Sequence, residues 1–196
     1  MAPRRFHPFL TTFAAFGVLF GAALGSLSAQ ERPKPSPADV RFMQGMIVHH
    51  DQALQMASLA GDRAGSEPLQ SLAGRIDVSQ RDEITMMRQW LTRRGHPVVA
   101  AENHTAHGGA EHGAMPGMAS PEEMVRLGTL RGGAFDRLFL ELMIRHHEGA
   151  LVMVRDLLAI DGAGQEPELY RFASDVDADQ RMEISRMRRL LTSSPQ

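Results

Sequence analysis

Two pairs of adjacent histidines are the residues in this sequence best suited to chemistry. They lie in "MIVHHDQALQMA" (46–57) and in "MIRHHEGALVMV" (143–154), and each pair has one methionine before it and another after it. Imidazole and thioether groups bind soft and borderline metals such as copper, and the chain has no cysteine to compete with them. The pattern therefore predicts metal binding. The candidate ligands are His49, His50, Met46, Met56, His146, His147, Met143 and Met153.

Polar residues on a second helix of each half could support these ligands. At about 100° per residue, the histidines lie on or beside the buried face of their helix, and the polar residues lie within or beside the apolar stripe of the next helix. In one interpretation they orient the rings of a metal site. In the other they form a buried hydrogen-bond network with the histidines, since unpaired buried polar groups cost about 1–3 kcal/mol each. The residues are Asp77, Gln80, Glu83, Asp177, Gln180 and Glu183.

The segment "HPVVAAENHTAHGGAEHGAMPGM" (96–118) is a separate signal. Its histidines and methionines are scattered among glycine and alanine without an apolar pattern that would bury them. Such a tract is typical of metal capture, and the alternative is a solvated linker. The capture residues that we predict are His104, His107, His112, Met115 and Met118.

The elements that must position these side chains are helices. Alternating runs typical of strands are nearly absent. "SPAD" (36–39) predicts a helix start, with serine as N-cap and proline in the first turn, and "SPEE" (120–123) repeats this signal for a short helix. Long helices are expected over about 36–60, 67–94, 133–160 and 168–191, each ending in a segment rich in glycine or proline.

The long helices form an internal repeat. His49 recurs 97 residues later as His146, and "IDVSQRDEITMMRQWL" recurs as "VDADQRMEISRMRRLL". Two helical hairpins that share an inward face predict an all-α four-helix bundle with pseudo-twofold symmetry. The expected organisation is a first hairpin over 36–94, a connection rich in His, Met and Gly with a short helix over 95–132, and a second hairpin over 133–192.

The N-terminal 29 residues have the layout of a secretory signal peptide. A basic start is followed by an apolar run and small residues, and cleavage is expected near Ala29 or Gln30. The alternative is an uncleaved anchor, but the apolar run is shorter than the roughly 20 residues of a spanning helix. We therefore expect a periplasmic or secreted protein without membrane association after cleavage. The net charge of −2 gives no basic face, so nucleic acid is not an expected partner.

These residues together resemble a known family. The paired "MIxHHxxAxxM" helices, the "QxxEIxxM" helices and the segment "SPEEMVRL…FDRLFLELMIRHHEGALVM" are similar to domain-of-unknown-function family 305, over about residues 36–192. The family contains secreted bacterial proteins, and a cyanobacterial copper-binding protein is similar to them. The resemblance implies a ferritin-like helical bundle, export from the cytoplasm, and a role in copper binding or tolerance.

Three functions follow from the sequence. The first is copper binding, buffering or trafficking in the cell envelope, where methionine favours Cu(I) and imidazole would also suit Cu(II) or Zn(II). Its partners would be the metal ion and either a second copy or an envelope copper-handling protein. The second is a structural or interaction bundle whose histidines and carboxylates fix the fold. The third, a dinuclear iron oxidase, requires Glu-x-x-His pairs that the chain lacks, and no other catalytic motif is present, so we expect no enzyme.

Overall fold

The protein is all-helical in the part that the computed structural model describes, residues 33–98 and 115–193. This confirms the all-α prediction. The predicted signal peptide and the loop residues His104, His107 and His112 lie outside the described residues. The helices are α1 (Pro37–Ser58), α2 (Ala60–Arg63), α3 (Glu67–Arg93), α4 (Pro121–Thr129), α5 (Gly132–Leu158) and α6 (Pro167–Ser193).

The helix starts follow from their first residues. Ser36 and Asp39 form a reciprocal capping box at the start of α1, in which the Ser36 N–H donates to Asp39 Oδ2 (2.8 Å) and the Asp39 N–H donates to Ser36 Oγ (3.2 Å). Ser120 and Glu123 form the same arrangement at α4. These contacts satisfy backbone donors that the first turn of a helix leaves without a partner.

Two buried aspartates join the hairpins to each other. Asp39 of α1 accepts the N–H of Gly164 in the turn between α5 and α6 at 2.8 Å. Its repeat copy, Asp136 of α5, accepts the N–H of Gly65 in the turn between α2 and α3 at 2.7 Å. The first helix of each hairpin therefore caps the turn of the other hairpin, and the start of α1 lies beside the end of α5.

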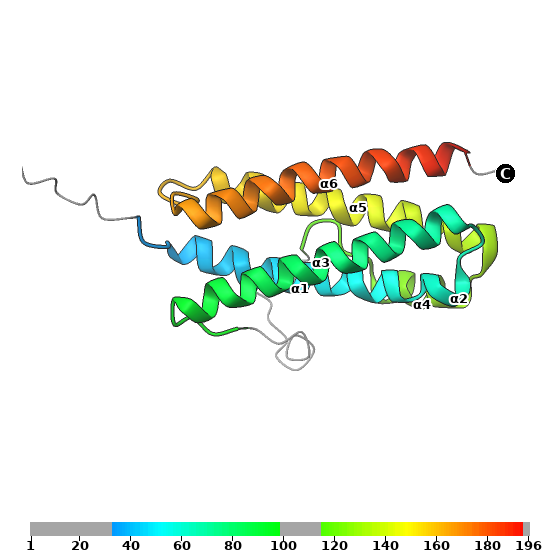
Figure 1. Ribbon diagram of the computed structural model, residues 1–196, viewed down its shortest axis with the longest axis horizontal. Helices are drawn as coiled ribbons and strands as arrows, with labels where there is room; N and C mark the ends of the chain where they lie inside the picture. Colours follow the sequence, from blue (N-terminus) through cyan, green and yellow to red (C-terminus); the bar gives the residue numbers. More distant parts are fainter. Residues whose placement is uncertain (1–32, 99–114, 194–196) are drawn as a thin grey trace, which may run out of the picture. The chain divides into compact units, whose positions relative to one another are not determined.

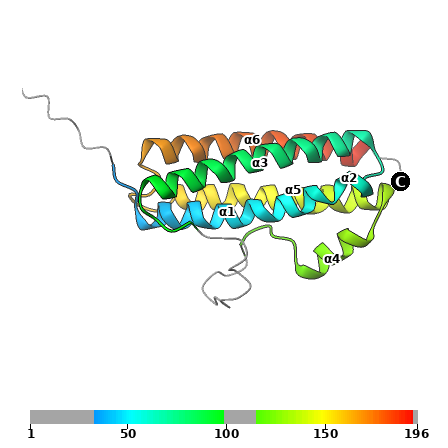
Figure 2. The same cartoon turned by 60° about the horizontal axis from the view of Figure 1, so that its bottom comes forward.

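The four long helices are arranged around a central pair. Helix α1 packs against α3, α5 packs against α6, and α1 and α5 contact each other (Figure 1). Figure 2 shows α3 and α6 on one side of the α1/α5 pair and α4 on the other. None of the described helices is both long enough and apolar enough to cross a membrane.

The core consists of two apolar clusters with polar residues between them. One cluster gathers Met43, Ile47, Trp90 and Phe172 with other residues from the start of α1 and the end of α5. The other gathers residues such as Met56 and Phe135 from the opposite ends of these helices. Each fully buried large apolar side chain stabilises the fold by about 1.5–3 kcal/mol, so the clusters can offset the cost of the polar residues between them.

Candidate functional site

Four buried histidines occupy the middle of the molecule, between the two apolar clusters. His49 and His50 are fully buried on α1, and His146 and His147 are at most 1% exposed on α5. This agrees with the face that their helical positions predict. Glu83 of α3 and Glu183 of α6 contact them, and Gln80 and Gln180 on the same two helices are also nearly fully buried. We refer to these eight residues as the histidine belt.

The outer two rings of the belt are held by carboxylates. His50 Nε2 contacts Glu83 Oε2, and His147 Nε2 contacts Glu183 Oε2 at 2.6 Å. Both contacts join the two helices of one hairpin, and the repeat reproduces the same pair twice. Each carboxylate thereby fixes the orientation of its imidazole, which is the usual way in which proteins orient a histidine ligand.

The inner two rings meet where α1 contacts α5. The ring centroids of His49 and His146 lie 3.8 Å apart, with an angle of 36° between the planes. His49 Nε2 donates to the backbone carbonyl of Pro116 at 3.0 Å, and His146 Nε2 donates to the carbonyl of His49 at 2.8 Å. These two rings therefore lie against backbone rather than against carboxylates.

The hydrogen bonds determine which nitrogen of each neutral ring carries the proton. A carbonyl or carboxylate oxygen only accepts, so Nε2 must donate in all four rings, and in a neutral ring Nδ1 then carries the lone pair. The four Nδ1 atoms are buried, and no residue that the structure describes gives them a hydrogen-bond partner. Neutral rings with a fixed tautomer and an unused lone pair have the form of histidine that binds metal.

Burial keeps the inner rings neutral. The pKa of His49 is lowered from 6.5 to about 3, chiefly by burial and then by the neighbouring His50, while the bond to Pro116 opposes the shift. The pKa of His146 also lies well below its ordinary value, because of burial and the nearby His49, His147 and His50. At neutral pH both rings therefore keep the lone pairs that a cation would need.

Carboxylates also line a surface groove behind the belt. Asp82 and Glu83 of α3 face Asp175 and Asp179 of α6 across this groove, so Glu83 contacts His50 on one side and the groove on the other. Burial and the charges of Glu83, Glu183 and Asp175 raise the pKa of Asp179. This side of the belt therefore has a negative potential, which attracts cations.

The predicted methionines lie beside the belt rather than together. Met46, Met56 and Met143 are fully buried in the apolar clusters, and Met153 is half-buried at the edge of the first cluster. Met153 and the predicted loop residue Met115 meet over Gly45 of α1. The Met153 methyl carbon lies 3.6 Å, and the Met115 sulfur 4.0 Å, from the position that a Cβ at Gly45 would take.

The belt is not a closed cage for an ion in this conformation. Within residues 33–98 and 115–193, no three or more His, Asp or Glu side chains are arranged to hold a metal. Binding to the belt would therefore use few ligands at once or require the rings to rotate. Among the predicted supporting residues, Glu83 and Glu183 contact the rings directly. Asp77 and Asp177 instead pair with Arg81 and Arg181 on the helix surfaces, at 2.8 and 2.7 Å.

Sequence reasoning did not predict the contacts of residues 115–119, which we call the strap. The carbonyl of Pro116 holds His49, and the side-chain amide of Gln52 bonds to the backbone of Ala119 in both directions, at 2.9 and 2.7 Å. Met118 of the strap is half-buried, and its carbonyl accepts from Arg145 at 3.5 Å. The available signal was a mismatch in the repeat, where Gln52 corresponds to Gly149.

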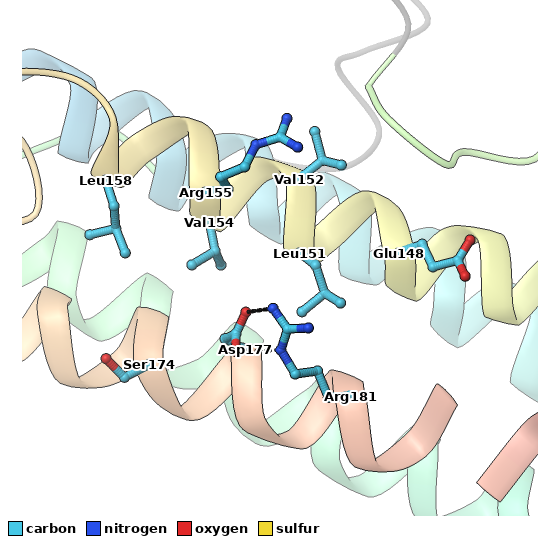
Figure 3. A pocket seen from close by; sticks show the side chains of 9 residues that line it. All are labelled: Glu148, Leu151, Val152, Val154, Arg155, Leu158, Ser174, Asp177 and Arg181. Atoms are coloured by element: carbon cyan, nitrogen blue, oxygen red, sulfur yellow. Dashed lines mark hydrogen bonds and ion pairs between the residues drawn. The ribbon is translucent and has the colours of Figure 1, made fainter. Parts of the chain in front are cut away.

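A surface pocket lies away from the belt. It has a volume of about 590 Å³ between α5 and α6, where Leu151, Val154 and Leu158 form its apolar wall (Figure 3). The ion pair of Asp177 and Arg181 borders it. None of the predicted histidine or methionine ligands lines this pocket, so its chemistry is separate from that of the belt.

The fold and the belt define an all-helical protein with a duplicated histidine–carboxylate centre. The model of DUF305, a domain of unknown function, matches residues 39–191, so the chain belongs to this family. No curated protein sequence matches it.

Solved structures with the same fold include two DUF305 proteins. A fragment from Deinococcus radiodurans is 36% identical, with a TM-score of 0.71, over 83% of this chain and 100% of the other. A protein from Streptomyces coelicolor, whose name describes it as secreted, is 34% identical, with a TM-score of 0.66, over 79% of this chain and 91% of the other.

CopM is a third structural neighbour. In its Cu(II)-bound form it is 29% identical to this chain, with a TM-score of 0.63, over 79% of this chain and 95% of CopM. CopM also has Cu(I)-bound and Ag-bound structures, which match this chain at 28% identity.

Proposed function

We propose that this protein binds copper in the cell envelope, as a buffer or carrier of the ion, and that the histidine belt is its main binding centre. The observation that carries the proposal is the set of four buried, unpartnered Nδ1 atoms on rings whose Nε2 atoms are already held. Copper is the cargo in this proposal, and the reaction is binding and release without catalysis. The four long helices would form a bundle of the ferritin-like type.

The belt residues have distinct tasks in this proposal. Glu83 and Glu183 hold the Nε2–H groups of His50 and His147 and thereby fix where both Nδ1 atoms point. His49 and His146 stay neutral because they are buried, so a cation does not have to displace a proton from them. Residues of the His- and Met-rich tract 96–118, including His104, His107 and His112, would capture the ion before it is transferred to the belt.

The nature of the donors sets the preferred ion. Buried imidazole suits both Cu(I) and Cu(II), and the methionines around the belt favour Cu(I). The similarity to CopM, which has Cu(II)-bound, Cu(I)-bound and silver-bound structures, supports copper as the cargo. The similarity to a protein named as secreted supports a location in the periplasm or outside the cell.

A competition experiment with substituted histidines tests the proposal. His→Gln at positions 49, 50, 146 and 147 removes each ring but keeps an amide N–H near the place of Nε2, so Glu83 and Glu183 keep a donor. The mature protein and this variant would be titrated with Cu(I) under anaerobic conditions against a chromophoric chelator. We expect the variant to lose most of the competition while circular dichroism shows unchanged helicity.

A variant without residues 99–114 serves as the matched control. If this deletion abolishes Cu(I) competition and the four-glutamine variant retains it, the tract is the binding centre and the belt is architecture. Equal competition by all three proteins would remove both sites from consideration.

A structural role for the belt is the second candidate function. It is favoured by the fact that every Nε2 atom of the belt already has a protein partner. In that case the four-glutamine variant would bind copper like the original protein, and its only change would be a lower melting temperature.

A further inference from the structure

The strap lies directly over the inner rings of the belt. Its Pro116 carbonyl accepts the Nε2–H of His49, and its residues 115–118 are only half-buried. On the opposite side, α3 and α6 cover the belt with helices that belong to the apolar clusters. The strap is therefore a cover of the belt that belongs to none of the helices.

Two glycines make the close approach of the strap possible. A Cβ on Gly149 of α5 would lie 1.9 Å from the Pro116 carbonyl oxygen, closer than any real contact. Gly117 of the strap has φ of +78°, and a Cβ there would lie 2.3 Å from the carbonyl oxygen of Arg145. Any side chain at either position would push the strap away, because backbone atoms are in the way and cannot rotate aside.

The repeat shows that the fold does not require these residues. Where α5 has Gly149, α1 has Gln52, whose side chain ties down the strap. Where α1 has Val48, α5 has Arg145, which bonds to Met118 of the strap. The two copies therefore differ at the positions that seat and anchor the strap, although they pack in the same kind of hairpin.

We infer that the strap is a gate over the belt, held shut by Gln52 and seated on Gly149, which controls how fast copper enters and leaves the His49–His146 pair. This inference rests on the proposed function. When the strap lifts, His49 Nε2 loses its acceptor, the ring is free to turn, and its lone pair becomes accessible from solvent. When the strap closes, Pro116 fixes the ring again and excludes water. Gln52 and Gly149 are thus positioning residues for a ligand that neither of them touches.

The test uses Gly149→Ala and Gln52→Leu in the full mature chain, with Gly74→Ala as the matched control. Gly74 is an exposed glycine of α3 with open space around it, so the same chemical change there leaves the strap intact. Amide hydrogen exchange at Ala119, followed by NMR in the absence of metal, reports on strap opening. Stopped-flow transfer of Cu(I) between a chromophoric chelator and the protein reports on access.

We expect Ala119 exchange and both copper transfer rates to rise at least tenfold in Gly149→Ala and Gln52→Leu, and to stay unchanged in Gly74→Ala. Faster exchange with unchanged transfer rates would overturn the gate and leave the copper proposal intact. Unchanged exchange in both variants would also overturn it, because the strap would not be held by these residues. If Gly149→Ala does not fold, Gln52→Leu alone decides.

Failure of the proposed function gives a different result. In that case the four-glutamine variant would transfer copper at the same rates as the original chain, whatever the rate of amide hydrogen exchange at Ala119.

Discussion

The two hairpins are alike on the side that faces the belt and different on the side that faces the strap. The pairs that match and lie on the side of the belt are Met46/Met143, His49/His146, His50/His147, Gln80/Gln180 and Glu83/Glu183. The pairs that differ and lie on the side of the strap are Gly45/Leu142, Val48/Arg145 and Gln52/Gly149. The belt contains matching residues from both hairpins, so it can be twofold symmetric. The strap is a single segment without a repeat copy, so its contacts with the two hairpins differ. The copies therefore diverged where one unrepeated segment packs against both of them.

The strap also breaks the symmetry of the inner rings. His49 donates to the strap, while its copy His146 donates to the backbone of α1. The two rings are equivalent in sequence and lie against each other at a tilt, but only His49 is held by a segment that lies outside the helices. The predictions below separate the chemistry of the belt, which both hairpins share, from the differences between the hairpins at the strap.

The largest expected effect is acid destabilisation through the inner rings. Since the folded pKa of His49 is about 3 and that of His146 is also lowered, the unfolded chain binds more protons below pH 6.5, and stability falls as pH falls. Between pH 6.5 and pH 5 the two rings together should lose about 4 kcal/mol of unfolding free energy, at roughly 1.4 kcal/mol per ring and pH unit.

Urea unfolding at several pH values measures this loss. The double variant His49→Gln/His146→Gln should lose most of the pH dependence, because its amides do not titrate. A slope that survives in this variant would place the titration in other residues.

The next largest effect concerns the outer rings, where the hairpins should respond equally. Glu83→Ala and Glu183→Ala each leave a buried imidazole N–H without an acceptor, which should cost about 2–3 kcal/mol in either hairpin. Denaturant unfolding of the two variants tests the equivalence. Costs that differ by more than about twofold would show that the belt is not symmetrical in energy.

A smaller effect has opposite signs at two glycines. Gly149→Ala forces the Pro116 carbonyl away and should cost about 1–3 kcal/mol, as overpacking does elsewhere. Gly74→Ala has open space around it and should stabilise its exposed helix by about 0.5–1 kcal/mol. Thermal or denaturant unfolding compares them, and a stabilised Gly149→Ala would mean that the strap is not seated on this residue.

The smallest effect is expected at the surface aspartates. Asp77→Ala and Asp177→Ala remove ion pairs with Arg81 and Arg181, four residues along the same helix, and should hardly change the free energy of unfolding because water screens exposed charges. Copper affinity in the chelator competition should not change. A clear loss of affinity in both variants would restore these residues to the binding centre.

The sequence by itself determined the local part of this protein. The 3.6-residue periodicity, the serine caps and the glycine-rich breaks located the helices to within about two residues, and the all-α prediction was confirmed. The same periodicity placed all four histidines on the buried faces. These features depend on neighbours within one or two helical turns, so short stretches of sequence are enough to predict them.

Only the tertiary structure decided which atoms meet. Asp77 and Glu83 both lie beside the same stripe of α3, but only Glu83 reaches a ring, and that depends on how α1 sits on α3. The stacking of His49 on His146 depends on where α1 contacts α5. The strap contacts join residues 67 positions apart in the chain. Helical periodicity gives the face of a side chain but not its partner, because a partner on another element is set by the distance and angle between elements.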